Sequence, residues 1–286
     1  MKTLLIATDF SANAKNAAEY AYRLASKLKT NLILCNAFIL PAEVPEAGFV
    51  SWPLYEYDEL QKDSVEELNK LKIELEMLGP GDEFKPALTC ISDTGTVSGT
   101  IHNVTEKMDV SMIVMSTHGS NALTEFLIGN HSRIMIEDSC TPLLLVPASA
   151  EIKTPKKIAF ATDFNFPKND LETIYELIDL IRPLNAELLI THIQDDREQS
   201  LEFKKWLYDF LAEISNKANY PHIYYRIVKG TDTERGLNWL CEHGHIDILT
   251  MVHREHNFFE RMFKGSHTQK MAKRISIPLL VLPEKK

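Results

Sequence analysis

The most constraining feature of this chain is a repeat that divides it into two similar halves. The segment 6–10, with the sequence IATDF, is matched by FATDF at 160–164, and PLLLVP at 142–147 is matched by PLLVLP at 278–283. Solenoid units recur every few tens of residues, so a repeat with this long a period indicates a duplicated domain. We therefore expect two copies of one architecture, which can be compared position by position.

The two copies align in two registers. Asp9 and Asp163 are 154 positions apart, whereas Gly129 and Gly265 are 136 apart. The second copy is therefore shorter between these points. We assign the surplus of the first copy to an extra loop at about 41–60, which is rich in proline and aromatic residues. The expected domains are 1–149 and 155–286.

Composition places the chain among ordinary globular proteins, with 44% hydrophobic and 25% charged residues. The net charge of −9 argues against nucleic acid or an anionic membrane as the main partner. No apolar run is long enough for a signal peptide or a membrane span. The four cysteines show none of the spacings of zinc sites or disulfide frameworks. We therefore expect a reduced, cytoplasmic protein.

Short apolar runs alternate with segments of helical periodicity in both halves. The run at 4–8 is typical of a buried parallel strand, and alanines and leucines between 14 and 28 mark one helix face. Further strands are expected at 32–35, 87–91, 112–115, 143–146, 157–161, 188–191, 223–228 and 248–251, and further helices near 68–78, 97–104, 132–138, 171–181 and 207–214. This alternation predicts an α/β fold with two tandem doubly wound domains, each a five-stranded, mostly parallel sheet with helices on both faces. Such sheets bind ligands at the carboxyl ends of their strands, where the strand order reverses.

The turn after the strand at 112–115 carries the clearest candidate for ligand binding. Glycines let backbone amides approach an anion, and a helix start exposes N–H groups that favour phosphate. Two interpretations stay open: a phosphate site, or a helix capped by Asn130 beside two surface histidines. The candidate residues are Ser116, His118 and Gly119, followed after nine residues by Gly129, Asn130, His131 and Ser132.

These motifs together resemble the universal stress protein family, and the resemblance spans both halves. Members that bind ATP carry the pattern Gly-x2-Gly-x9-Gly-Ser/Thr, which falls here on Ser116, Gly119, Gly129 and Asn130. Two of these positions depart from the pattern, although both keep small polar side chains, and Ser132 supplies a hydroxyl nearby. The resemblance implies a Rossmann-like, adenine nucleotide alpha hydrolase-like fold.

The resemblance also implies roles for residues at the ends of the first two strands. Thr8 and Asp9 would face the ribose or a metal ion, with Mg²⁺ as the candidate, and Ala37 would lie beside the adenine. The implied cofactor is ATP, with or without Mg²⁺. Asp9 has a structural alternative as a cap for the following helix. Because both copies keep Thr-Asp, we expect that Asp9 also has a structural role.

The second copy departs further from the family pattern. Val252, Glu255, Gly265 and Ser266 occupy the four positions. A β-branched side chain and a carboxylate replace two glycines, so space and like-charge repulsion both oppose a triphosphate. We predict that this degenerate site is closed to ATP or altered for another ligand. Three basic residues leave some attraction for anions there: Arg254, Arg261 and Lys264.

No catalytic residues are assigned. The chain has no Gly-x-Ser-x-Gly nucleophile elbow and no Gly-Lys-Ser/Thr phosphate loop, so rapid phosphoryl transfer is not expected. Five late histidines could supply metal ligands, but no zinc spacing is present and we favour a solvated loop. They are His243, His245, His253, His256 and His267.

The predicted function is that of a tandem universal-stress-type protein that binds adenine nucleotide in its first domain and has a regulatory, stress-response role. Two alternatives remain: a non-nucleotide interaction scaffold or binder of an apolar ligand, and a slow ATP hydrolase. The closing strands at 143–146 and 279–282 are wholly apolar, and such edges need cover. We therefore expect an internal pseudo-dimer of the two domains across these strands. A homodimer of the whole chain stays open.

Overall fold

The chain divides into two compact units at the join between the two sequence copies. Of the described residues, those up to Ala148 belong to the first unit and those from Ser149 onward to the second. The computed structural model describes residues 2–40, 54–78, 84–117, 129–194, 201–230, 233–254 and 276–284.

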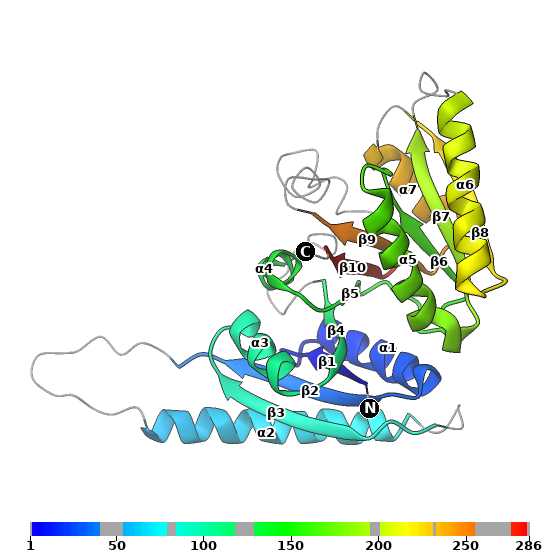
Figure 1. Cartoon of the computed structure of the whole chain (residues 1–286). Coiled ribbons are helices and arrows are strands. Elements are labelled where there is room, and N and C mark those ends of the chain that lie inside the picture. Colours follow the sequence, from blue (N-terminus) through cyan, green and yellow to red (C-terminus); the bar gives the residue numbers. More distant parts are fainter. Residues whose placement is uncertain are drawn as a thin grey trace, which may run out of the picture. The chain divides into compact units, whose positions relative to one another are not determined.

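The first unit is a parallel sheet with helices on both faces (Figure 1). Its sheet has the order β3-β2-β1-β4-β5, and every pairing described within it is parallel. Helices α1 and α2 contact each other, as do α3 and α4, and α2 and α3 lie on opposite sides of β2 and β3. In chain order the elements are β1 (Thr3–Ala7), α1 (Ala12–Leu28), β2 (Asn31–Phe38), α2 (Leu54–Glu76), β3 (Leu88–Thr94), α3 (Val97–Lys107), β4 (Val110–Ser116), α4 (Asn130–Asp138) and β5 (Leu143–Val146).

The second unit repeats this arrangement. Its strands have the order β8-β7-β6-β9-β10, again with parallel pairing, so the predicted pair of five-stranded doubly wound domains is confirmed. No helix in the described stretches combines the length and apolarity needed to cross a membrane. The elements are β6 (Lys157–Ala161), α5 (Pro167–Ile181), the 3₁₀ turn η1 (Arg182–Leu184), β7 (Glu187–Gln194), α6 (Leu201–Ala218), β8 (Ile223–Lys229), α7 (Thr233–His243), β9 (Ile248–His253) and β10 (Leu279–Pro283).

Local sequence explains the first strand and helix. β1 is buried along all but its first residue, as expected for a central strand covered on both faces. Helix α1 begins after Ser11, whose side chain accepts a hydrogen bond from the Ala14 amide at 3.2 Å, and it ends at Lys29 in the left-handed conformation. The small residues on its inner face let it pack closely on the sheet. They are Ala14, Ala17, Ala18, Ala21 and Ala25.

The predicted loop at 41–60 is wrong in its second part, because α2 begins at Leu54. Residues 41–53 lie outside the described stretches. No side chain between Tyr57 and Asp63 is buried, so these first turns of α2 lack the apolar stripe that reveals a helix in sequence. Nor is the surplus confined to one loop. Helix α2 has 23 residues where α6 has 18, and the connections beside them are also longer: 39–53 against 195–200, and 77–87 against 219–222.

The strand order of the first unit reverses between β1 and β4. The chain runs outward from β1 through β2 to β3 and then returns to β4 on the other side of β1. Doubly wound sheets bind ligands at this point. Thr8 and Asp9 directly follow β1, and Ser116 ends β4. The fold therefore brings three of the predicted site residues to one end of two neighbouring strands.

Candidate functional site

Thr8 and Asp9 form a hydrogen-bonded turn after β1. The Thr8 amide donates to the Cys35 carbonyl at 2.9 Å. Thr8 Oγ1 accepts from the Phe10 amide at 3.0 Å, and Asp9 Oδ1 accepts from the Ser11 amide at 3.1 Å. Phe10 has a φ of 62°, a left-handed conformation that a non-glycine residue adopts when its surroundings hold it there. The two side chains therefore shape the turn that leads into α1.

The second unit contains the same turn. The Phe164 amide donates to Thr162 Oγ1 at 2.9 Å, and the Asn165 amide donates to Asp163 Oδ1 at 3.0 Å. Phe164 has a φ of 58°. The Thr-Asp pair thus has a structural role in both units, as its presence in both copies led us to expect. A ligand role for Asp9 would be added to this one, and its side chain is exposed to solvent.

A buried polar chain supports the Thr8 turn. Asn36 of β2 donates through Nδ2 to the Thr8 carbonyl at 2.7 Å, and its Oδ1 accepts from the Ser64 hydroxyl of α2 at 2.8 Å. The hydroxyls of Ser64 and Ser92 lie 2.6 Å apart. Asn36 is 7% exposed and Ser64 is 5% exposed, so each needs the partner it has. This series of hydrogen-bonded side chains links α2 and β3 to the end of β1.

In the second unit His192 takes the place of Asn36. The strand registers put the two residues at equivalent positions. His192 Nδ1 lies 2.8 Å from the Thr162 carbonyl, and since a carbonyl only accepts, Nδ1 carries the proton. The imidazole packs 5.2 Å from the Phe164 ring. Phe164 is surrounded by further aromatic rings, those of Phe203, Trp206, Phe210 and Tyr225. An aromatic cluster has replaced the polar chain.

Ser132 ties the start of α4 to the end of β4. Its hydroxyl donates to the Ser116 carbonyl at 3.0 Å, and the residue is only 2% exposed. The Gly129 amide donates to the Thr117 carbonyl at 2.7 Å. These bonds fix the helix start against the strand end. The geometry gives the Ser132 hydroxyl a positioning role beneath the predicted phosphate site.

Gly129 is the N-cap of α4, so the alternative interpretation of Asn130 as the N-cap is wrong. Asn130 and His131 are the first two helical residues, and both are exposed. The first amides of a helix have no intrahelical partner, and the N-cap Gly129 has no side chain to bind those of α4. The helix start can therefore receive an anion. His118 and Gly119 lie outside the described residues, and their roles stay predictions.

The position expected beside the adenine differs in size between the units. Ala37 of β2 pairs with Asp93, and Ile193 stands at the equivalent position in β7. A Cβ placed on Gly236 of α7 would lie 2.6 Å from Ile193 Cγ1, so the helix packs directly on this isoleucine. The methyl group of Ala37 takes up far less space. The second unit is filled where the first carries a small residue.

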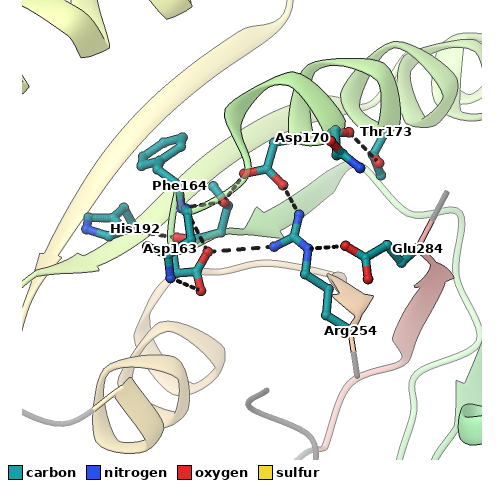
Figure 2. A network of polar contacts seen from close by, with 10 residues as sticks. Asp163, Phe164, Asp170, Thr173, His192, Arg254 and Glu284 are labelled. Carbon is teal, nitrogen blue, oxygen red and sulfur yellow. Dashed lines mark hydrogen bonds and ion pairs between the residues drawn. The ribbon is translucent and has the colours of Figure 1, made fainter. Parts of the chain in front are cut away.

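The interpretation of Arg254 as an attraction for anions is wrong, because its guanidinium is paired with carboxylates (Figure 2). Nη2 donates to Asp170, while Nη1 and Nε lie 3.6 Å and 3.4 Å from oxygens of Asp163 and Glu284. Val252, in β9, is partly exposed. The other second-copy residues singled out in the sequence lie outside the described stretches: Glu255, Arg261, Lys264, Gly265 and Ser266.

The late histidines form no metal site where the structure describes them. Across the described stretches, no three His, Cys, Asp or Glu side chains are grouped so as to hold a metal ion. His243 Nδ1 lies 3.1 Å from the Trp239 carbonyl one turn back in α7, and the two rings stack at 5.3 Å. His256 and His267 are not among the described residues.

Sequence reasoning missed three residues that shape the strand ends, namely Asn36, His192 and Asp170. Asn36 and His192 are polar residues in largely apolar strands at matching positions, a signal that the internal alignment contains. Asp170 has no local signal, because its partner Arg254 is 84 residues away along the chain.

Comparison with known proteins identifies the architecture. The universal stress protein family model matches residues 1–147 and again 154–283. A universal stress protein from Archaeoglobus fulgidus has a TM-score of 0.74 and 18% identity, with 99% of this chain and 98% of that chain covered. A functionally unknown protein from Pseudomonas aeruginosa has a TM-score of 0.61 and 12% identity, with 99% and 93% covered.

A universal stress protein in complex with cAMP is similar over one half of this chain. Its TM-score is 0.39 and its identity 16%, with 51% of this chain and 97% of that chain covered. No curated protein matches the chain. Because the family model matches nearly all of the sequence in two successive domains, the chain belongs to the universal stress protein family as a tandem member.

Proposed function

We propose that the first unit binds an adenine nucleotide, ATP, at the carboxyl ends of β1 and β4, and that the protein acts as a regulatory module in a stress response. The observation that carries this proposal is the meeting of two features at the switch point of the sheet. The Thr8–Asp9 turn follows β1, and the uncapped start of α4 is held against the end of β4. The family resemblance supports the same assignment.

The start of α4 suits a phosphate group. Gly129 has no side chain to cap the helix, and the amides that follow it carry the positive end of the helix dipole. Ser132 holds the helix start in place through the Ser116 carbonyl. Ala37 is the small residue that stands at the β2 position which the family resemblance places beside the base.

Mg²⁺ would be held through Asp9. One oxygen of this exposed carboxylate already accepts from the Ser11 amide, which orients the group. Mg²⁺ prefers carboxylate, water and phosphate oxygens, and it commonly uses only one or two protein carboxylates. A bound cation would offset the repulsion between Asp9 and a triphosphate. The residues present therefore fit a magnesium nucleotide.

The test is calorimetric titration of nucleotide-stripped protein with ATP and Mg²⁺. We expect saturable heat from the wild-type chain and none from Gly119→Glu, which copies the second unit's residue into the first. Glu255→Ala, at the aligned position of the second unit, is the control and should bind as the wild type does. Unchanged affinity in Gly119→Glu would show that the site lies elsewhere, and no heat from the wild type at millimolar ATP would refute nucleotide binding.

Asp9→Asn tests the metal assignment separately. The amide oxygen can still accept from Ser11, so the turn is preserved while the charge is lost. We expect affinity for ATP to fall about tenfold with Mg²⁺ present and to stay the same or rise without it. An equal loss under both conditions would mean that Asp9 supports the site only through the fold.

We also propose that the two units pair through β5 and β10. Each is the last strand in the order of its own sheet, and both are apolar, so an unpaired edge would invite aggregation. Hydrogen exchange on the intact chain tests this. Slow exchange of the outward-facing amides of both strands is expected, and fast exchange typical of a free edge would contradict the pairing.

A further inference from the structure

Arg254 is a buried cation surrounded by three carboxylates from three different elements. It directly follows β9, and its side chain is 7% exposed. Its guanidinium meets Asp163 in the turn after β6, Asp170 in α5 and Glu284 after β10 (Figure 2). The ring of Phe166 covers the guanidinium, with Cζ 4.8 Å from the ring centroid. Nη2 therefore donates a hydrogen bond, while Nη1 and Nε lie only at ion-pair distance from carboxylates, and Nε has no hydrogen-bond partner among the described residues. The aromatic ring covers one face of the group.

The pair at the centre of this cluster is buried most deeply. Asp170 is 0% exposed, and it receives the Nη2 bond from Arg254 on one oxygen. Its other oxygen accepts from Thr162 Oγ1 at 2.5 Å. Thr162 Oγ1 in turn accepts from the Phe164 amide, which belongs to the turn after β6. The guanidinium is thus connected to the same turn that carries Asp9 in the first unit.

The internal alignment shows that this cluster exists in only one copy. In the register of the opening motif, Asp163 matches Asp9 and Asp170 matches Asn16. In the register of the closing segment, Arg254 matches His118. The guanidinium therefore stands against the carboxylate that corresponds to Asp9, at the strand ends where the proposed ligand of the first unit would lie.

We propose that Arg254 is the resident occupant of the strand-end site in the second unit, and that it determines that this site takes neither a nucleotide nor a free metal ion. The tethered guanidinium supplies the positive charge that a bound cation would supply beside Asp9. This inference goes beyond the proposed function and rests on it only for the location of the site, because the contacts of Arg254 do not depend on ligand binding in the first unit.

Charge and burial explain why neither ligand competes. One guanidinium faces three carboxylates, so the cluster is negative as a whole and repels a polyphosphate. A metal ion would have to displace a cation that is covalently attached and already desolvated. Removing that cation would leave Asp170 buried and unpaired, which is strongly unfavourable. The site is closed because its own side chain fills it.

The test measures the second unit through its own tryptophans. The chain has three, Trp52, Trp206 and Trp239, and Trp52→Phe leaves fluorescence only from the second unit. In this background and without nucleotide, Arg254→Met should lower the thermal midpoint by about 6 °C or more. Arg254→Lys keeps the positive charge but lacks the planar guanidinium group. Its thermal midpoint should therefore fall between those of the Trp52→Phe parent and the Arg254→Met variant.

A second substitution that removes the Asp170 charge tests whether Arg254→Met destabilises the unit through an uncompensated charge or through lost packing. Arg254→Met combined with Asp170→Asn, the residue that the first unit has at this place, should recover at least half of the lost midpoint. An unchanged midpoint in Arg254→Met would overturn the proposal, as would a double variant that recovers nothing. If Arg254→Met alone does not fold, the double variant decides: a folded protein supports the proposal, and failure to fold overturns it.

Discussion

The two strand-end turns of this protein are built alike but have different neighbours. After β1 and after β6, a threonine hydroxyl and an aspartate oxygen bind backbone amides around a phenylalanine with positive φ. In the first unit the turn rests on Asn36, and its aspartate is exposed to solvent. In the second unit the turn rests on His192, and its aspartate, which is also exposed, lies 3.6 Å from Arg254 Nη1.

This comparison distinguishes the residues that shape the turn from the neighbouring residues that bear on ligand binding. The Thr-Asp pair recurs because it shapes the turn, so its recurrence alone is no evidence for two ligand sites. The evidence for function lies in what surrounds the turn: a small Ala37 and an uncapped α4 on one side, a packed Ile193 and a paired Arg254 on the other. Duplication kept the scaffold, and the two sites diverged around it.

The largest expected effect contrasts Asp170 with its counterpart Asn16. Asp170→Ala leaves Arg254 buried without its closest partner and should lower the free energy of unfolding of the second unit by about 3–5 kcal/mol. Among the described residues, Asn16 makes only long contacts, 3.4 Å and 3.5 Å, to two backbone carbonyls, so Asn16→Ala should lose less than about 1 kcal/mol. Urea-dependent hydrogen exchange of α5 and α1 measures both, and equal losses would break the comparison.

The next effect concerns the support of the Thr8 turn. Asn36→Leu removes the partner of the Thr8 carbonyl and of the Ser64 hydroxyl, which should lower the free energy of unfolding by about 1–3 kcal/mol. Asn36→His copies the second unit and retains a donor toward Thr8, so its loss should be smaller. Chemical unfolding of the two variants checks this order. If the histidine variant is the less stable one, the two supports are not interchangeable.

A smaller effect is expected at the start of α4. Ser132→Ala removes the bond to the Ser116 carbonyl and should lower the free energy of unfolding by about 1 kcal/mol, whereas the exposed His131→Ala should change it by less than about 0.5 kcal/mol. Nucleotide affinity should change little in Ser132→Ala, because this hydroxyl bonds to the strand. A loss of affinity without a loss of stability would instead make Ser132 a direct phosphate ligand.

The last effect is common to both units, is absent at neutral pH and appears only at alkaline pH. Burial raises the pKa of the Cys35 and Cys241 thiols from 9.0 to about 12. The unfolded chain ionises these thiols near pH 9 and the folded chain does not, so their contribution to stability is complete below pH 9 and falls as the pH rises toward 12. Each thiol should contribute a slope of up to about 1.4 kcal/mol per pH unit in this window.

Alkylation and substitution check the thiol assignment. Exposed Cys140 should react first with a thiol reagent at pH 8, the partly exposed Cys241 more slowly, and buried Cys35 only as the chain unfolds. Cys241→Ala should flatten the alkaline part of the stability profile. Reaction of Cys35 and Cys140 at one rate in the folded protein would contradict the burial of Cys35.

The sequence predicted the architecture because the relevant signals are local or repeated. Apolar runs located the strands, and the matching motifs predicted two domains of similar architecture. The start of α2 was missed because no buried side chain marks residues 57–63. The N-cap of α4 was misplaced by one residue, from Gly129 to Asn130, because either residue is compatible with a helix start.

The charged cluster of the second unit could not be predicted in the same way. Its members, Asp163, Asp170, Arg254 and Glu284, come from distant parts of the chain and meet only in the folded unit. By itself Arg254 suggested a site for anions, and only its three contacts show the opposite. Pairing of this kind depends on tertiary packing, which periodicity and spacing do not encode.

The most direct test of the central claim is the number of nucleotides bound per chain. Equilibrium dialysis of the stripped, full-length protein against radiolabelled ATP with Mg²⁺ measures this number at saturation. One nucleotide per chain, lost in Gly119→Glu and retained in Glu255→Ala, is the predicted result. Two nucleotides per chain, or one that survives Gly119→Glu, would contradict the assignment of an open first site and a self-occupied second site.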